Sequence, residues 1–350
     1  MLAKKIVIAI LICICCVQVH AQDAATAQVL INEGIKLHDA GDYKGAISKY
    51  RQALITDVDN VNALYEMSFT FYAEGEYDSS IMICKELINL KAPDGILKNV
   101  YVNLGSAYDD INKPDDAIDA YEQGIKKFPG FYLLYFNKGI TLYFQKRIKE
   151  ARQTLQTAVD LNPMHPGSHY WLAQILQNQN RVPAILAASM VCIIDSNSKR
   201  AVNAAILVDS LLLHANNVEQ KDSGKQITVY LPPVNKDEKK KENDFAFVEL
   251  GLSMMQVSKT SDTIKLDTHE KLFSYNYNML CGLLDNYKKY KGFYWAFYAQ
   301  FFSEAKKKDY DDIIVHLILQ HIDGGESALW LKAHRDDVNN FYDWLHNFQW

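Results

Sequence analysis

The sequence has little cysteine, and what it has forms no recognisable pattern. Only six of the 350 residues are cysteine, and three of these lie before residue 17. The others, Cys84, Cys192 and Cys281, are odd in number and stand at no spacing typical of a metal site or a disulfide framework. We therefore expect them to be small apolar residues of the core.

Catalytic motifs are missing as well. The chain contains no Gly-x-Ser-x-Gly turn and no glycine-rich phosphate loop. His316 and His321 are five residues apart on one expected helix, so they fall on different faces and predict no zinc site. The sequence therefore predicts no enzyme, no cofactor and no metal. An active site built from scattered residues leaves no motif, and this alternative stays open.

Neither an excess of basic residues nor a second long apolar run is present. The formal net charge is −5, which disfavours a nucleic-acid partner because such partners bind basic faces. Beyond residue 17 no stretch approaches 18 consecutive apolar residues. We therefore expect no transmembrane segment in the mature chain.

The first 21 residues have the features of a secretory signal peptide. Lys4 and Lys5 precede an apolar run over 6–17, and Val19 and Ala21 provide compact residues before a cleavage site at Gln22. The protein is therefore expected to be exported and to be periplasmic, outer-membrane-associated or extracellular, which allows peripheral association with the envelope. An uncleaved anchor and lipidation of a nearby cysteine are the alternatives.

A period of 34 residues dominates the chain from about residue 27 to 197. Small residues recur at one position of this period, with spacings of 34, 37, 34 and 34. They are Gly34, Ser68, Gly105, Gly139 and Ala173. Such a period indicates stacked helix pairs, each of which buries its apolar face only against its neighbours.

The third repeat carries the clearest motif. Leu104-Gly105 and Tyr108 belong to an expected first helix, Ala117 and Tyr121 to a second, and Pro129 ends the unit. In this pattern the chain resembles the tetratricopeptide repeat (TPR) family. The resemblance covers about half of the chain. It implies that Gly105 lets the two helices approach closely and that Tyr121 fills the gap between adjacent repeats.

The resemblance implies an all-α fold, a TPR α-solenoid that forms a right-handed superhelix of helical hairpins, followed by a C-terminal helical domain. We expect about five repeats and a capping helix in 22–215, although Pro183 should interrupt the start of the second helix of the fifth repeat. Residues 216–243 are expected to be a linker that contains a β-like stretch at 226–231. Residues 244–350 are expected to be helical.

Repeat positions 2, 5, 9, 12 and 13 of the first helices line the concave groove of TPR solenoids, as the family resemblance implies. Mapped onto this chain, they predict an aromatic and polar groove with one acidic patch. The candidate binding residues are Tyr65, Phe69, Tyr72, Asn99, Asp109, Phe136, Tyr143 and Tyr170. Ile31 and Ile35 replace the basic and amide residues with which some TPR domains hold a terminal carboxylate, so that subtype is not expected.

Two interpretations of these aromatic residues stay open. They can bind a peptide or helix, because aromatic rings provide large contact areas at low entropic cost. Alternatively, some of them pack against the chain's own C-terminal segment. The aromatic run over 293–302 is expected to be a buried helix rather than a membrane-interface belt. Further helices are expected over 267–290, 310–322 and 327–348.

The preferred function is therefore a non-enzymatic scaffold in the cell envelope that binds a protein or peptide in its groove. One alternative is an enzyme or ligand-binding protein with its site in the C-terminal helical domain. Another is a structural subunit of an envelope assembly.

Overall fold

The computed structural model describes residues 25–213, 218–220, 227–229, 243–258 and 266–350. The predicted signal peptide and most of the predicted linker lie outside these ranges. The chain forms two compact units, 1–147 and 148–350. Within the described ranges, no helix combines the length and the apolar content that crossing a bilayer requires.

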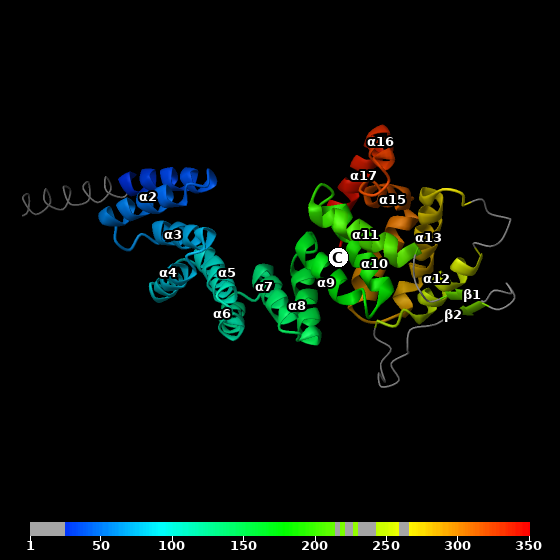
Figure 1. The fold of residues 1–350 in the computed structure, drawn as a ribbon, viewed down its shortest axis with the longest axis horizontal. Coiled ribbons are helices and arrows are strands. Elements are labelled where there is room, and N and C mark those ends of the chain that lie inside the picture. The colour runs from blue at the N-terminus through cyan, green and yellow to red at the C-terminus, as the bar shows by residue number, and fades with distance from the viewer. Residues whose placement is uncertain (1–24, 214–217, 221–226, 230–242, 259–265) are drawn as a thin grey trace, which may run out of the picture. The chain divides into compact units, whose positions relative to one another are not determined.

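The first unit is a row of antiparallel helices (Figure 1). It begins with a helix over 25–39, and each later helix packs against the one before it. The later helices are α2 (Tyr43–Thr56), α3 (Val61–Glu74), α4 (Tyr77–Asn89), α5 (Asp94–Asp110), α6 (Pro114–Lys127) and α7 (Tyr132–Phe144). The predicted all-α fold of repeated helical hairpins is confirmed.

Local sequence signals fix where these helices start and stop. The side chain of Asp42 accepts a hydrogen bond of 3.0 Å from Gly45 N, and that of Asn60 accepts one of 2.9 Å from Ala63 N. These are N-caps, which satisfy backbone donors that a helix start leaves unpaired. Gly75 ends α3 in the left-handed region at φ 87°, which glycine adopts without steric cost. The hairpins are therefore encoded locally.

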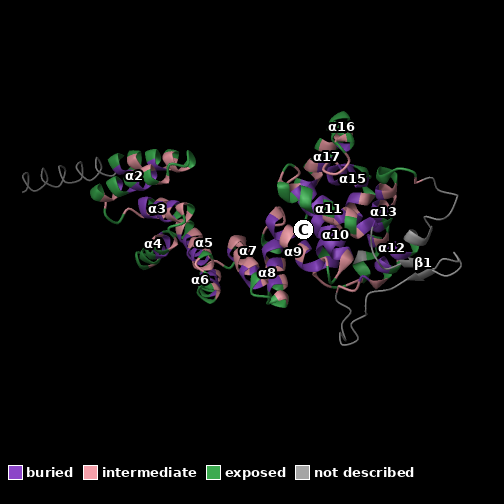
Figure 2. Ribbon diagram, in the orientation of Figure 1, coloured by how far each residue is buried: buried purple, intermediate pink, exposed green. Residues whose placement is uncertain are grey.

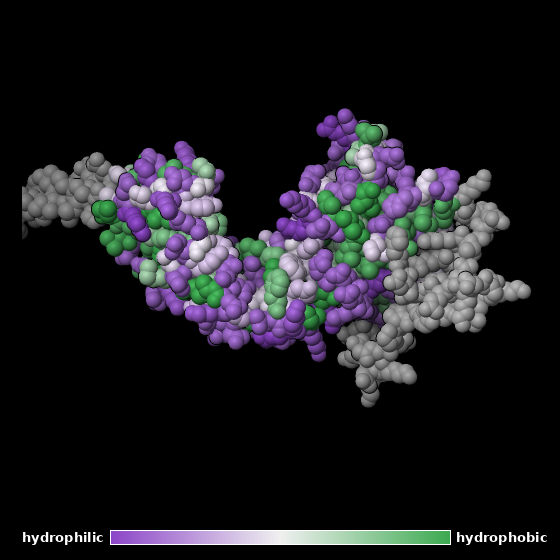
Figure 3. All heavy atoms as spheres, viewed as in Figure 1, coloured by the Kyte–Doolittle hydropathy of each residue, from purple (hydrophilic) through white to green (hydrophobic). Residues whose placement is uncertain are grey.

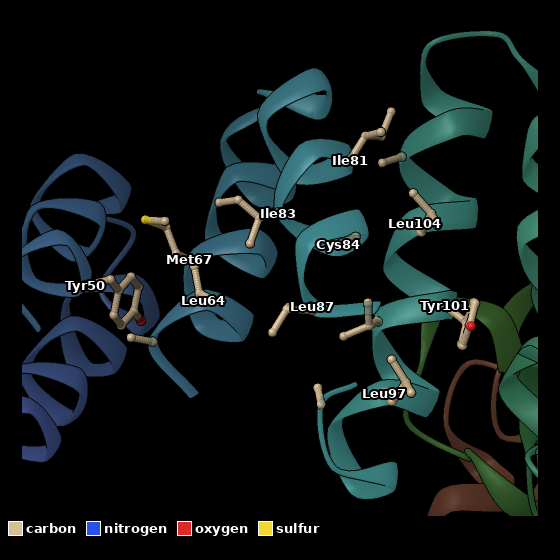
Figure 4. Packing of buried hydrophobic residues seen from close by; sticks show 14 of the residues in the cluster. Tyr50, Leu64, Met67, Ile81, Ile83, Cys84, Leu87, Leu97, Tyr101 and Leu104 are labelled. Atoms are coloured by element: carbon tan, nitrogen blue, oxygen red, sulfur yellow. The ribbon is translucent and has the colours of Figure 1, made fainter. Parts of the chain in front are cut away.

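The core of the first unit runs continuously between the helices. Figure 4 shows buried side chains from Tyr50 in α2 through Leu64 in α3 and Cys84 in α4 to Tyr101 in α5. A Cβ atom at Gly34 would overlap the ring of Tyr50, and one at Gly105 would overlap the ring of Tyr121. In the first and third repeats the small residue and the aromatic ring are thus one packing unit, as the family resemblance implies.

The second unit begins within the fourth repeat. Its repeat helices are α8 (Ile148–Leu161), α9 (Pro166–Leu176), α10 (Arg181–Ile194) and α11 (Lys199–Leu213). The C-terminal helices are α12 (Ala246–Ser258), α13 (His269–Leu283), α14 (Gln300–Lys307), α15 (Asp311–Leu319), α16 (Glu326–Ala333) and α17 (Arg335–His346). A 3₁₀ helix over Leu284–Lys289 and a π-helical turn over Trp295–Ala299 complete it.

Helix α10 lies at the centre of this unit. Every residue from 182 to 193 is buried, and Figure 2 shows this helix almost entirely in the colour of buried residues. It packs against α9 and α11 on the repeat side, and against α12, α15 and the π-helical turn on the other. A helix that is apolar all round needs neighbours on every side. The C-terminal helices supply them.

This packing divides the chain differently from the predicted domain limits of 22–215, 216–243 and 244–350. The compact unit unites α8–α11 with the C-terminal helices. The reason is the second apolar face of α10, which the repeat pattern does not reveal. Residues 218–220 and 227–229 form the short strands β1 (Val218–Gln220) and β2 (Ile227–Val229), paired antiparallel, in agreement with the expected β-like stretch.

Two expectations about helix ends are wrong. Pro183 does not interrupt its helix, because it is the third residue of α10, in the first turn, where a missing backbone donor costs nothing. The expected helix over 327–348 is two helices, α16 and α17, which meet at His334. The imidazole Nδ1 of His334 lies 2.9 Å from the carbonyl oxygen of Trp330 at this junction.

The aromatic run over 293–302 is buried, as expected. Trp295 is stacked between Phe245 and Tyr290, with ring centroids 4.1 and 4.2 Å away. Phe301 is stacked against Trp344 and Trp350, at 5.2 and 5.1 Å. These rings come from three separate segments of the chain. Phe245, Trp295 and Phe301 are buried in the core of the C-terminal helices, whereas Trp350 is 38% exposed. Cys84, Cys192 and Cys281 are buried free thiols, which confirms their predicted place in the core.

Candidate functional site

The candidate site is the inner face of the first unit. We define it as the surface that α3, α5 and α7 present at repeat positions 2, 5, 9, 12 and 13. Helix α5 contacts both α3 and α7 directly, although each pair is separated by a second helix in the sequence. The first helices of successive repeats therefore form one layer, which is the arrangement expected of a helical-repeat array.

Helix α3 contributes Tyr65, Phe69 and Tyr72. Spacings of four and three place these residues on one side of the helix. Tyr65 and Tyr72 are half-buried, whereas the Phe69 side chain is 40% exposed. The ring of His38, from the helix over 25–39, lies 5.1 Å from that of Phe69. This end of the inner face is thus a cluster of partly exposed rings.

Helix α5 contributes two neighbouring carboxylates. Asp109 accepts a short hydrogen bond from the hydroxyl of Thr141 in α7. Asp110 lies near the hydroxyl of Tyr72 in α3, and it adds to the effect of burial in raising the pKa of that hydroxyl. The hydroxyl of Tyr121 lies 3.2 Å from Ser106 Oγ, behind the same patch. The bond from Thr141 connects two successive repeats through side chains rather than through backbone.

Burial affects the ionisation of this patch. It raises the pKa of Asp109, and the nearby charge of Asp110 raises it further, although the bond from Thr141 opposes this. Burial also raises the pKa of Glu66, and the carboxylate of Asp39 adds to that shift. The pKa of the Tyr72 hydroxyl is raised mainly by burial and then by Asp110. Negative charge is therefore concentrated in a partly desolvated place.

Helix α7 contributes Phe136 and Tyr143. Both are half-buried, and the adjacent Phe144 is 60% exposed, with its ring 5.5 Å from that of Tyr143. The ammonium of Lys146 lies 6.0 Å from the Tyr143 ring. On the side drawn in Figure 3, apolar residues of the first unit form small patches separated by hydrophilic ones. Such patches are suited to reversible contacts rather than to a permanent apolar interface.

The remaining two predicted residues, Asn99 and Tyr170, do not belong to the contacts described so far. Asn99 lies in α5, but its amide nitrogen donates to Gly95 O of its own helix at 3.3 Å. Tyr170 belongs to the second unit, where its ring packs 5.9 Å from that of Trp171. The adjacent His169 bonds to Tyr298, so this repeat contacts the C-terminal helices, although His169 is not one of the predicted groove residues. The structure thus places seven of the eight candidates in one unit.

Three residues of the site are absent from the predicted set. His38 stands at inner position 12 of the first repeat, so the phase of the repeat contains the signal for it. Glu66 and Thr141 stand at positions 6 and 10, outside the inner set. Only the coordinates reveal that Thr141 reaches Asp109 and that Glu66 lies close to Asp39.

The described residues contain no group of three or more His, Cys, Asp or Glu side chains able to hold a metal ion. His316 is instead stacked on Trp330 at 4.0 Å and bonded to Ser327 at 2.8 Å. One buried ion pair lies between α10 and α12, where Arg181 Nη1 is 3.6 Å from Glu249 Oε2. Glu249 Oε1 also accepts from Val182 N at 3.1 Å, so the pair joins two helices of the core.

Comparison with known proteins agrees with this geometry. Residues 102–163 and 136–184 match the model of the tetratricopeptide repeat family. A peroxisomal targeting signal receptor from Candida albicans is 28% identical over 92 residues, which are 26% of this chain and 15% of that protein. A tetratricopeptide repeat protein 30 homolog from Caenorhabditis briggsae is 25% identical over 142 residues, 40% and 20% of the two chains. The matches thus cover only a small part of either relative.

The chain is also similar, at low identity, to two solved structures. A thermophilic TPR protein from Thermus thermophilus has a TM-score of 0.45 and 18% identity, covering 52% of this chain and 98% of that one. PilF from Pseudomonas aeruginosa has a TM-score of 0.47 and 16% identity, covering 54% and 84%. The helical hairpins, their glycine–aromatic packing and the family match show that residues 102–184 of this chain contain tetratricopeptide repeats. Its repeats are of the type that mediates protein–protein interactions.

Proposed function

We propose that this protein is a non-enzymatic scaffold that binds an extended peptide segment of a partner protein on the inner face of α3, α5 and α7. One observation carries the proposal. Tyr65, Phe69 and Tyr72 in α3 and Phe136 and Tyr143 in α7 are only partly covered, whereas the rings of Tyr50 and Tyr121, which pack between the two helices of their repeats, are buried. Rigid, partly exposed rings on adjacent helices are the kind of surface on which binding energy concentrates.

The mechanism in this proposal is contact on a preformed surface. The rings provide apolar contact, and the carboxylates of Asp109 and Asp110 fix the register of the bound segment through hydrogen bonds. The carboxylate of Asp109 is already oriented by Thr141, so little of its side-chain entropy is lost on binding. No cofactor is needed.

The test is a selection of random 12-residue peptides displayed on phage, using the full-length mature protein. We expect enriched peptides to lose binding to a variant with Tyr65, Tyr72 and Tyr143 all changed to alanine. The matched control changes Ile55 and Met82 to alanine, because these side chains are 82% and 64% exposed on second helices. Equal binding to the wild type and the triple variant, with both folded by circular dichroism, would show that the inner face is not the binding surface.

The proposed location is the cell envelope or the medium. It is supported by Lys4 and Lys5, the apolar run over 6–17 and the compact residues before Gln22. Mass spectrometry of the protein isolated from its native source should find an N-terminus at Gln22 in an exported fraction. An intact chain that begins at Met1 in the cytosolic fraction would contradict the proposal.

A further inference from the structure

We infer that the inner face selects a peptide segment with lysine or arginine side chains, and that one of these cations binds where Tyr72 meets Asp110. This inference rests on the proposed function, because it names the chemical class of segment that the same surface would take. Three observations support the inference: the distribution of charged residues over the first unit, the hydrogen bond that orients Asp109, and the aromatic rings beside the carboxylates.

Charge is distributed unevenly over the first unit. Its four repeats have twenty inner positions, counting positions 2, 5, 9, 12 and 13 of each. Three of these are aspartate, namely Asp39, Asp109 and Asp110, and none is lysine or arginine. The unit does not lack basic residues, because thirteen lysines and arginines occur between residues 25 and 147. All thirteen lie outside the inner positions. The inner face is therefore acidic because the basic residues are placed on other surfaces, and not because the unit has few of them.

The acidic residues of this face have no cationic partner. Among the described residues, no lysine or arginine lies within 4.0 Å of the carboxylates of Asp39, Glu66, Asp109 or Asp110. Acids elsewhere in the same unit do form such pairs. Lys49 is 2.7 Å from Glu33, and Lys138 is 2.6 Å from Glu122. The negative charge of the inner face is thus left uncompensated by the chain itself.

One of the two central carboxylates is also preorganised. Thr141 donates one hydrogen bond to Asp109, which orients that carboxylate but leaves its charge and its other lone pairs unused. Partial burial keeps water from screening this charge fully, and the raised pKa of Asp109 reflects the resulting strain on the ionised form. An incoming cation would relieve that strain, whereas an incoming carboxylate would increase it.

The neighbouring rings fit the same class of partner. The faces of aromatic rings attract cations. The first unit already uses this contact, with Lys98 Nζ 4.9 Å from the centre of the Phe131 ring and Lys146 Nζ 6.0 Å from that of Tyr143. Lys146 occupies the α7 side of the inner face. Among the described residues no lysine lies over the ring of Tyr72, so a ligand side chain could contact that ring and the carboxylate of Asp110 together.

The experiment uses the mature full-length protein and the same 12-residue peptide selection. We expect enrichment of peptides that contain lysine or arginine beside apolar residues. Replacing the basic residues of the best peptide by glutamine should weaken binding about tenfold, and replacing them by glutamate should weaken it further. Raising the salt concentration from 50 to 500 mM should also weaken binding of the basic peptide.

The matching protein variants change charge without changing shape. Asp109→Asn with Asp110→Asn should reduce affinity for the basic peptide about tenfold and remove the preference over its glutamine form. Asp115→Asn with Asp116→Asn is the control, because it makes the same charge change at exposed positions in the first turn of α6. Thermal unfolding of each variant checks that the fold is intact.

The possible results separate this inference from the function on which it rests. Enrichment of neutral or acidic peptides that still depend on Tyr65, Tyr72 and Tyr143 would overturn the inference and leave the proposed function standing. Binding of basic peptides that is unaffected by Asp109→Asn with Asp110→Asn would also overturn it. No enrichment of any peptide, or equal binding to the triple alanine variant, would overturn both.

Discussion

The hydroxyl of Tyr298 donates a hydrogen bond of 2.7 Å to Nδ1 of His169. The roles of the two atoms follow from the other side of the imidazole, where Nε2 lies 2.8 Å from the carbonyl oxygen of Pro163. A carbonyl oxygen can only accept, so Nε2 carries the proton and Nδ1 is left to accept from Tyr298. His169 is fully buried and neutral, and it links the fifth repeat to the C-terminal helices.

The first prediction concerns pH. Burial lowers the pKa of His169 from 6.5 to about 4 in the folded protein. Stability that depends on its neutral form is fully present above about pH 6.5 and is lost as the pH falls towards 4. The loss contributed by this group is about 3 kcal/mol at most. Urea unfolding at pH 7 and pH 4.5 measures it. In a His169→Gln variant the difference between the two pH values should be smaller by about 2 kcal/mol.

The second prediction concerns the donor in the same contact. Tyr298→Phe removes the hydroxyl and leaves a buried imidazole nitrogen without a partner. The free energy of unfolding should fall by about 1–3 kcal/mol at pH 7. Tyr135→Phe is the control, since the hydroxyl of Tyr135 bonds to Pro129 O at 3.0 Å in an exposed place, and its loss should change stability by less than about 0.5 kcal/mol. Equal effects in denaturant unfolding would show that the His169 contact is not structural.

The third prediction concerns the packing of glycine against an aromatic ring. Gly105→Ala places a methyl group in the space occupied by the ring of Tyr121, so it should destabilise the protein by about 1–3 kcal/mol. Gly95→Ala lies in the same helix with nothing within 4 Å of the new atom, and it should be neutral or stabilising by up to about 1 kcal/mol. Thermal unfolding of both variants gives the comparison. Similar melting temperatures would mean that α5 and α6 can move apart without loss.

The fourth prediction concerns the buried ion pair of α10 and α12. Glu249→Gln keeps an oxygen for Val182 N but leaves the guanidinium of Arg181 buried without a countercharge. We expect a loss of about 3–5 kcal/mol. Asp267→Asn breaks the pair with Lys271, in which both side chains are more than half exposed, and should change stability little. Replacing both Arg181 and Glu249 by apolar residues should be less harmful than Glu249→Gln alone.

Much of the fold can be predicted from the sequence because the repeat pattern indicates which residues pack against each other. A glycine and an aromatic residue sixteen positions apart, as at Gly34 with Tyr50 and Gly105 with Tyr121, fix how two helices meet. The partner of α10 cannot be predicted in this way. The sequence of a helix that is apolar on every side shows that it must be surrounded, but not by which helices. The C-terminal helices do not belong to the repeat pattern, so that pattern cannot identify them as neighbours of α10.

The candidate site can likewise be predicted only in part. The phase of the repeat is enough to place Tyr65, Phe69 and Tyr72 on one side of α3, since these positions depend only on helical geometry. It cannot indicate that Thr141 reaches Asp109, because that bond depends on the separation of α5 and α7. Nor does it reveal that Tyr170 belongs to the other compact unit. The position of residues on one side of a helix can be predicted from their spacing, whereas contacts between helices depend on the three-dimensional structure.

The burial of α10 also bears on how this chain can change over evolutionary time. An array of similar hairpins usually lengthens or shortens by duplicating or losing whole units, since a new unit finds the same surface that the old one met. Here the last hairpin meets helices of a different kind, through Glu249 and Tyr298 among others. A unit inserted at that junction would have to reproduce both surfaces at once. Growth or loss of repeats is therefore expected among relatives in the segment before α8, while the number of helices from α10 onward stays constant.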